Sequence, residues 1–207
     1  MINYFFSSLD YGSVAFVGIL FAFAMTCLML SKCTRILPKD MGRAYAHDGS
    51  LSAGKPRGAG FWFVLVYVAS TLIFAKMNVE ILIYLILVVA AMLTGFLDDC
   101  AKSPWGEYKK GILDLIIAIM LAITFLNFND NRIFIACADK YVTINPVVFG
   151  ILIVILVWAS INVTNCSDGV DGLSGTLTII TLSSVYVIDL ILSLIHISEP
   201  TRQEAIS

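Results

Sequence analysis

The amino-acid sequence predicts an all-α polytopic membrane protein with about six transmembrane helices. Apolar residues make up 59% of its 207 residues and charged residues only 14%, and the mean hydropathy is +0.90. Soluble domains average about 45–50% apolar and about 25% charged residues. The apolar residues are also gathered into runs that are long enough to cross a bilayer as helices, with polar loops between them.

Six apolar runs are expected to be the spans of a single transmembrane domain. They cover residues 12–30, 60–75, 81–97, 111–126, 147–161 and 173 to about 195. The second run is short, and the sixth contains several Ser and Thr residues and Asp189. Between the fourth and fifth runs, residues 132–137 and 140–144 alternate in polarity around Ala138 and Asp139, which predicts a small extracytoplasmic β-hairpin.

The basic residues predict how the chain crosses the membrane. Loops 31–59 and 98–110 carry nine of the 13 Lys and Arg residues, whereas the loops of opposite parity carry only Lys76, Arg132 and Lys140. Because cytoplasmic loops are enriched in Lys and Arg, we expect the N-terminus outside and both basic loops in the cytoplasm. With six spans, loop 162–172 is cytoplasmic as well.

Two acid clusters therefore meet at the cytoplasmic face, Asp98 and Asp99 after the third run and Asp168 and Asp171 after the fifth. Charges are costly in hydrocarbon, so these acids need an aqueous rim and a partner. Such acids could bind Mg²⁺, relay protons or merely solvate a loop. The lysines near Asp98 and the glycine-rich, basic segment 54–60 favour a metal site with a phosphate-bearing substrate.

Taken singly, these features have simpler interpretations. The acids could be turn or cap residues, and the lysines could be ordinary flanking residues of a cytoplasmic loop. The five cysteines show no Cys-x-x-Cys spacing and no histidine at ligand spacing, so neither a disulfide framework nor a zinc site is expected.

Three motifs in combination resemble the polyprenyl-phosphate N-acetylhexosamine-1-phosphate transferases (glycosyltransferase family 4). They are GFLDD at 95–99, NVTNCSDGVDGL at 162–173 and GKPRGAG at 54–60. The motifs follow the family's order with spans between them, and the resemblance covers about residues 10–192. The two acid motifs are most similar to the phospho-N-acetylmuramoyl-pentapeptide transferases, whereas GKPRGAG departs from their GTPTMGG.

The resemblance implies an Mg²⁺-dependent phosphotransferase in the bacterial cytoplasmic (inner) membrane, with its active face toward the cytoplasm. Such an enzyme transfers phospho-N-acetylmuramoyl-pentapeptide from a UDP-sugar to undecaprenyl phosphate and releases UMP, in the synthesis of cell-wall lipid intermediates. UDP-N-acetylglucosamine is the alternative donor. The lipid bilayer and a second copy of the chain are the other implied partners, and no nucleic acid is expected.

The resemblance also assigns roles to single residues. The catalytic and metal-binding residues it implies are Asp98, Asp99 and, for the metal, Asp171. The implied nucleotide-sugar site consists of Asn165, Asp168, Asp171 and Gly172. The implied phosphate-binding residues are Lys55, Lys102 and Lys110. Direct attack and a covalent aspartyl intermediate both remain open as mechanisms.

The family fold has about ten spans, so we expect this chain to be the N-terminal part of a longer transferase domain and inactive alone. Residues 1–192 carry the family character, and residues 193–207 resemble nothing in the family. Two other classes stay open, a membrane transporter, which needs acids deep inside its spans, and a non-catalytic scaffold, which needs none of them.

Overall fold

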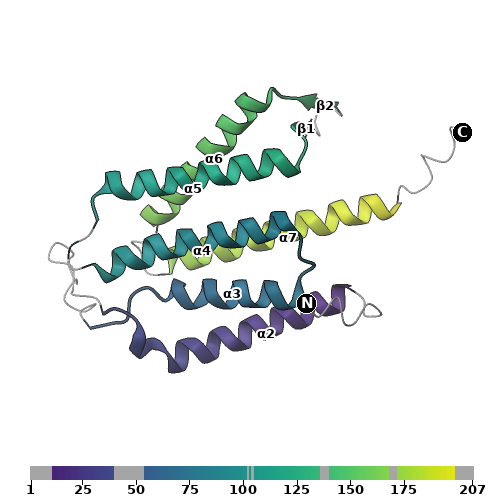
Figure 1. Cartoon of the computed structure of the whole chain (residues 1–207). Coiled ribbons are helices and arrows are strands. Elements are labelled where there is room, and N and C mark those ends of the chain that lie inside the picture. Colours follow the sequence, from purple (N-terminus) through teal and green to yellow (C-terminus); the bar gives the residue numbers. More distant parts are fainter. Residues whose placement is uncertain are drawn as a thin grey trace, which may run out of the picture. The chain divides into compact units, whose positions relative to one another are not determined.

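The computed structural model describes residues 11–39, 54–101, 103, 105–135, 140–167 and 172–198. Most of these residues are helical, and one two-stranded sheet accompanies the helices (Figure 1). The chain divides into two compact units, Met1–Trp158 and Ala159–Ser207, which are described separately below.

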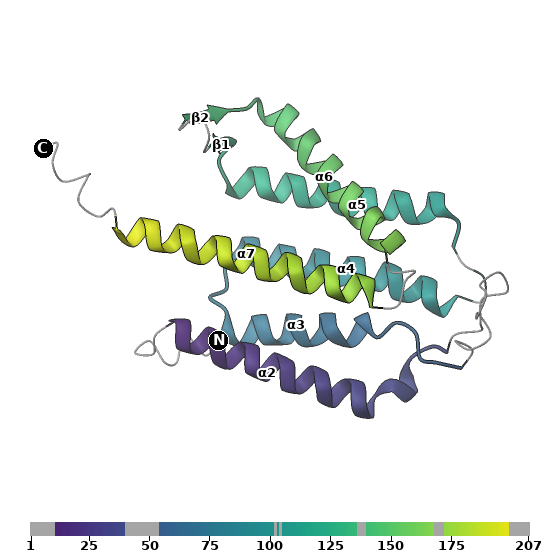
Figure 2. The ribbon, with the colours of Figure 1, turned by 180° about the vertical axis from the view of Figure 1, so that it is seen from behind.

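The first unit is a row of helices, each packed on the next in the chain. The row consists of α2 (Tyr11–Lys32), α3 (Gly60–Phe74), α4 (Val79–Cys100) and α5 (Glu107–Phe128), with the short 3₁₀ helix η1 (Thr34–Ile36) after α2. The contacts run from α2 to α3, from α3 to α4 and from α4 to α5, and the front and back views agree on this order (Figure 2).

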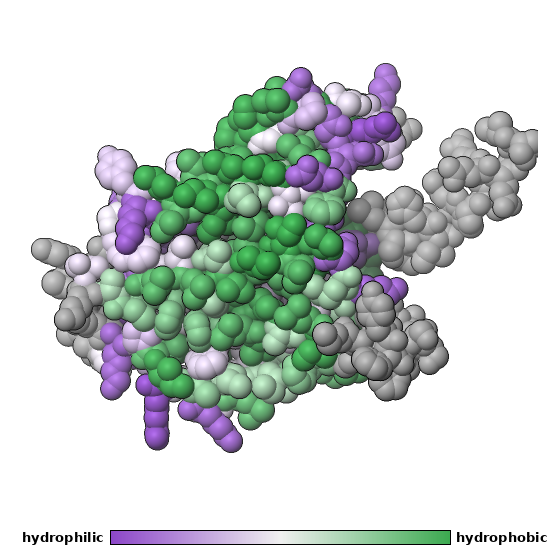
Figure 3. Space-filling model, in the orientation of Figure 1, coloured by the Kyte–Doolittle hydropathy of each residue, from purple (hydrophilic) through white to green (hydrophobic). Residues whose placement is uncertain are grey.

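Among the described residues, five helices are long and apolar enough to cross a membrane, and a further apolar helix is shorter. The five are α2, α4, α5, α6 (Pro146–Ser167) and α7 (Leu173–Ser198). The short one, α3, has 15 residues, which gives about 22 Å against a hydrocarbon core of about 30 Å. The predicted multi-pass helical fold with a short second span is confirmed, and the apolar surface covers the helices between polar ends (Figure 3).

Two helices extend into the acid-containing motifs that follow the apolar runs. Helix α4 continues to Cys100, so Asp98 and Asp99 lie in its last turn. Helix α6 continues to Ser167, so the prediction that the second acid loop begins at Asn162 was wrong. Residues 162–167 contain neither Gly nor Pro, so nothing in this stretch interrupts the helical backbone hydrogen bonds.

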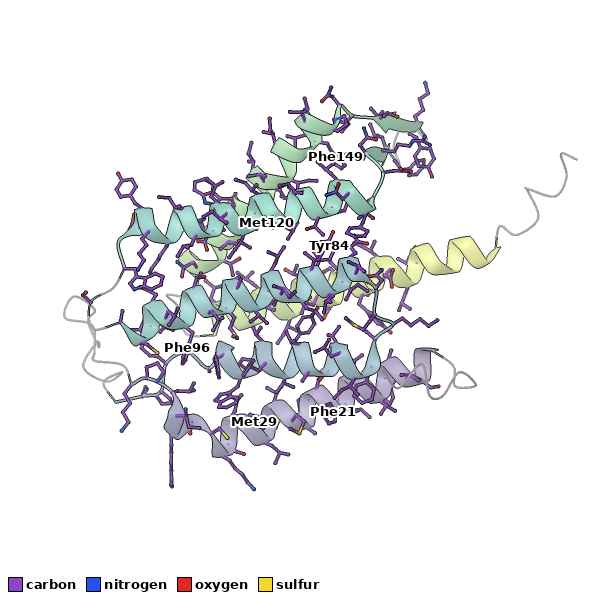
Figure 4. All side chains as sticks on the ribbon, in the orientation of Figure 1. Phe21, Met29, Tyr84, Phe96, Met120 and Phe149 are labelled. Carbon is purple, nitrogen blue, oxygen red and sulfur yellow. The ribbon has the colours of Figure 1, made fainter. Side chains whose placement is uncertain are left out.

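Helices α2 and α3 approach closely at a glycine. A Cβ atom at Gly18 would lie 3.0 Å from the Cβ and Cγ atoms of Phe74. The ring of Phe74 packs on that of Phe21, with the two centroids 5.4 Å apart. Phe21 is labelled in Figure 4. Small residues allow such close approach in membrane helices, where van der Waals packing replaces the hydrophobic effect as the driving force.

A polar cluster joins the start of α4 to the end of α5. The Asn78 side chain caps α4 by accepting a 2.7 Å hydrogen bond from the Ile81 amide. Glu80 accepts hydrogen bonds from the Tyr84 hydroxyl at 2.9 Å and from Asn129 Nδ2 at 2.5 Å. Tyr84 is labelled in Figure 4, at this end of the helices.

The predicted hairpin is confirmed as strands β1 (Arg132–Ile135) and β2 (Lys140–Thr143). The strands pair antiparallel from Arg132↔Thr143 to Ile135↔Lys140. The rings of Phe134 and Tyr141 pack across the strands at 5.0 Å. The predicted turn residues, Ala138 and Asp139, lie outside the described residues.

The first part of α6 returns along α5 within the first unit. The rings of Phe125 and Phe149 meet edge to face at 5.9 Å, and the Trp158 indole N–H donates a 2.9 Å hydrogen bond to the Gly111 carbonyl.

In the second unit, Gly172 has a φ of 78°. The Gly172 carbonyl accepts hydrogen bonds from the amide and the hydroxyl of Thr176. These bonds belong to the first turn of α7, which begins at Leu173.

The contact at Gly18 yields a stability prediction. Gly18→Ala should destabilise the protein by about 1–3 kcal/mol, because Phe74 Cβ is tied to the backbone of α3 and cannot move away easily. The measurement is thermal unfolding in detergent. Gly95→Ala is the matched control, since a Cβ atom there meets nothing within 4 Å. Equal losses in both variants would contradict the packing argument.

Candidate functional site

Asp98 links the end of α4 to the beginning of α5. Its Oδ2 atom lies 2.5 Å from Lys110 Nζ, and the Asp98 side chain is only 15% exposed. Its Oδ1 atom accepts a 2.7 Å hydrogen bond from the backbone N–H of Trp105. Both carboxylate oxygens are therefore engaged by the protein itself, and Asp98 fixes the connection between the two helices.

The local sequence explains why Lys110 can reach Asp98. Helix α4 ends at the extended residue Ala101, and α5 begins after the extended residue Gly106, which places Lys110 in the first turn of α5. The ammonium group of the adjacent Lys109 lies 3.5 Å from the centroid of the Trp105 ring, a cation–π contact. The hydrogen bond from Trp158 to the Gly111 carbonyl holds the same turn from α6.

Asp99 is paired with a cation from a distant segment. Arg57 Nη2 lies 3.1 Å from Asp99 Oδ1, with the two side chains 46% and 28% exposed. The backbone of Arg57 is anchored, because its N–H donates a 2.7 Å hydrogen bond to the Pro38 carbonyl and Lys39 forms a β-bridge with Pro56. Pro38 and Lys39, which follow η1, thus anchor the backbone beside Arg57 near the end of α4.

Gly58 lets this segment lie close to α4. Its φ of 73° favours glycine, and a Cβ atom there would lie 3.3 Å from Phe96 Cδ2 and 3.6 Å from Asp99 Oδ2. The Phe61 ring stacks on Phe96 at 4.6 Å, and Phe96 is labelled near the end of α4 in Figure 4. Arg57 and Gly58 of this segment therefore lie against Asp99 and Phe96.

The donor set suits a hard cation only in part. Two carboxylates offer oxygen ligands, and Mg²⁺ commonly uses one or two carboxylates together with water and substrate phosphates. Among the described residues, no group of three His, Cys, Asp or Glu side chains comes together to hold a metal. The residues present therefore fit the protein's share of a magnesium site that also uses phosphate oxygens.

The remaining predicted site residues are placed as follows. Lys55 is exposed and forms an ion pair with neither aspartate in the part of the chain that the structure describes. Asn165 is exposed near the end of α6, and Gly172 directly precedes α7. Lys102, Asp168 and Asp171 lie outside the described residues.

Several residues at the site were not singled out from the sequence. Arg57 was read only as added positive charge, and the Asp99 contact depends on a long connection that carries no pairing signal. The part played by Trp105 comes from its backbone amide, which no residue type encodes. Asp114, one turn after Lys110 on α5, interacts electrostatically with it, and its four-residue spacing from Lys110 was the available signal.

The sequence profile of glycosyl transferase family 4 matches residues 81–201. The chain belongs to glycosyl transferase family 4. The match begins in α4 and therefore includes Asp98, Asp99 and Lys110 of the site described above.

Relatives of this family member carry a consistent name. A protein of Treponema pallidum named phospho-N-acetylmuramoyl-pentapeptide-transferase is 38% identical over 179 residues, covering 85% of this chain and 49% of that protein. Proteins of the same name from Rippkaea orientalis and Clostridium botulinum are 33% and 32% identical, over 65% and 63% of this chain and 40% and 42% of theirs. The chain spans about half the length of these relatives. No solved structure matches it.

The contacts of Asp98 predict the hydrogen exchange of one amide. In Asp98→Ala the Trp105 N–H loses a charged acceptor, and its exchange should accelerate about tenfold or more. Asp98→Asn keeps an acceptor oxygen and should retain most of the protection. The measurement is residue-resolved hydrogen exchange. Asp99→Ala is the control, and an equal acceleration in that variant would contradict the assignment.

Proposed function

We propose that this family member transfers a phospho-N-acetylhexosamine, preferentially phospho-N-acetylmuramoyl-pentapeptide, from a UDP-sugar to undecaprenyl phosphate, with release of UMP. The observation that carries the proposal is the pair Asp98 and Asp99 at the end of an apolar helix, each facing a cation from another segment. The names of the relatives support the sugar. The acceptor lipid and the UDP-sugar rest on the motif resemblance.

In this proposal Asp99 and Asp98 would contribute oxygen ligands to Mg²⁺, and the assignment of Asp171 to the metal rests on the motif resemblance alone. When bound, the ion neutralises the charge that develops on the transferring phosphoryl group. Asp98 additionally holds Lys110 at the start of α5. Lys110 is then in place to bind a phosphate oxygen beside the acids, and Lys55 and Lys102 are proposed to bind phosphates at the mouth of the site.

The nucleotide sugar is proposed to bind at Asn165, Asp168, Asp171 and Gly172. Asn165 is exposed at the end of α6, and its amide can both donate and accept hydrogen bonds. Gly172 adopts a left-handed conformation just before α7, so a ligand meets only backbone atoms there. UDP-N-acetylglucosamine is the second candidate donor, because Arg57 stands where the muramoyl-pentapeptide enzymes resembled have a neutral residue.

The site is proposed to face the cytoplasm of a bacterial inner membrane. The end of the first unit that carries Asp98 and Asp99 also carries most of its described cations. These are Lys32, Arg35, Lys39, Lys55, Arg57, Lys109 and Lys110. Because Lys and Arg concentrate in cytoplasmic loops, this asymmetry supports the proposed orientation.

A chimera tests the function and the need for a longer chain together. We expect this chain alone to release no UMP from UDP-N-acetylmuramoyl-pentapeptide in membranes supplied with undecaprenyl phosphate and Mg²⁺. A chimera in which it replaces the matching segment of the Treponema pallidum relative should release UMP. Asp99→Asn in the chimera should lower kcat by about 100-fold or more, because the charge-stabilising ligand is lost.

Asp130→Asn is the control for this chimera. Asp130 is an exposed acid just after α5, at the end opposite the site, and its loss should leave UMP release unchanged. If the Asp99→Asn chimera releases UMP as fast as the unchanged chimera, the proposed role of Asp99 is refuted. Turnover with UDP-N-acetylglucosamine alone would assign the alternative donor.

A further inference from the structure

The two ion pairs at the end of α4 differ in length and in exposure to solvent. Asp98 is 15% exposed, contacts Lys110 at 2.5 Å and accepts a second hydrogen bond from Trp105. The Arg57–Asp99 pair is longer, at 3.1 Å, and its side chains are 46% and 28% exposed. Because ion pairs with a solvent-exposed member add little to stability, exchanging this one contact of the Arg57 guanidinium for another costs little.

The backbone of Arg57 is nevertheless fixed beside the site. The hydrogen bond to Pro38 and the Lys39–Pro56 bridge hold the segment on one side. Leu37, which directly precedes Pro38, is buried and only 5% exposed. On the other side Gly58 lies against Phe96, and Phe61 stacks on the same ring. A fixed backbone with a half-exposed guanidinium allows the charged group to change partners without unfolding the loop.

A divalent cation on Asp99 must compete with this guanidinium. Both are positive, so a metal at Asp99 repels Arg57 and displaces it from the carboxylate. The released guanidinium keeps its charge and presents a planar set of N–H donors that matches a phosphate in bidentate geometry. The released guanidinium can then donate hydrogen bonds to a phosphate group whose oxygen also approaches the metal.

We propose that Arg57 is an exchangeable cation of this site, which covers Asp99 when no metal is bound and binds the phosphate group of a substrate when the metal takes Asp99. This inference rests on the proposed metal-binding role of Asp99. It adds a phosphate-binding residue and an order to the site, since phosphate reaches Arg57 only after the metal has released it. The phosphate belongs either to a soluble diphosphate or to a lipid monoester in the membrane.

Phenylglyoxal modification of arginines, read by mass spectrometry, tests the exchange in the 207-residue chain in phosphatidylcholine nanodiscs. Mg²⁺ should raise the modification rate of Arg57 about two- to fivefold, the range expected for releasing an exposed ion pair. Adding pyrophosphate with Mg²⁺ should lower the rate again. Arg35, an exposed arginine in η1, is the internal control and should not respond.

Two further arms separate the ligand sources and the underlying role of Asp99. Protection by pyrophosphate indicates a soluble diphosphate, and protection only by phosphatidic acid in the nanodisc indicates a lipid phosphate. Protection by neither overturns the proposal. In Asp99→Asn, Arg57 should react faster than in the unchanged chain without Mg²⁺, and adding Mg²⁺ should no longer change its rate.

A measurement of Mn²⁺ binding distinguishes the exchange of Arg57 from the metal-binding role of Asp99. Binding is measured as the loss of the electron paramagnetic resonance signal of free Mn²⁺. The exchange predicts that Arg57→Gln tightens Mn²⁺ binding about two- to fivefold, because a competitor is gone, while Arg35→Gln leaves it unchanged. Binding that depends on Asp99 but ignores Arg57 would overturn the exchange and leave the metal site standing. Binding that ignores Asp99 would overturn both.

Discussion

The ion pair between Asp98 and Lys110 is the interaction on which the site depends. A carboxylate at the end of an apolar helix cannot stay uncompensated next to hydrocarbon, because desolvation of an unpaired charge costs several kcal/mol. Lys110 meets this demand from the first turn of α5, and the Trp105 amide occupies the other oxygen. These two contacts hold the connection between α4 and α5 against the end of α4.

Asp98 and Asp99 are neighbours in sequence but have different surroundings. Asp98 points its oxygens at partners from its own hairpin of helices, whereas the partner of Asp99 comes from the segment before α3. In the proposed chemistry this difference divides the work. Both carboxylates are proposed to bind the metal, but Asp98 also keeps Lys110 and the start of α5 in place, whereas Asp99 exchanges its contact with Arg57 for the metal.

The sequence was sufficient for the helices and insufficient for the contacts between them. Apolar runs predict spans because hydrocarbon excludes unsatisfied backbone groups, and the alternation around residues 138–139 predicts the hairpin. The extension of α6 past Asn162 was missed, since polarity marks where a helix leaves the membrane and not where it ends. The contact of Arg57 with Asp99 joins residues that are far apart in the sequence, and no local pattern encodes such a contact.

The proposed chemistry uses two groups of residues of different character. The first group is Arg57, Asp98, Asp99 and Lys110, and the second includes Asn165 and Gly172. The first group handles charge, through carboxylates for a cation and cations for phosphate, whereas the second offers an amide and an open backbone suited to a sugar or a base. Charge neutralisation serves any member of the family, because the phosphates are common to all of the proposed substrates. The choice of sugar must then come from groups outside the acid pair, and for this reason the Asp-Asp motif identifies the reaction class better than the donor.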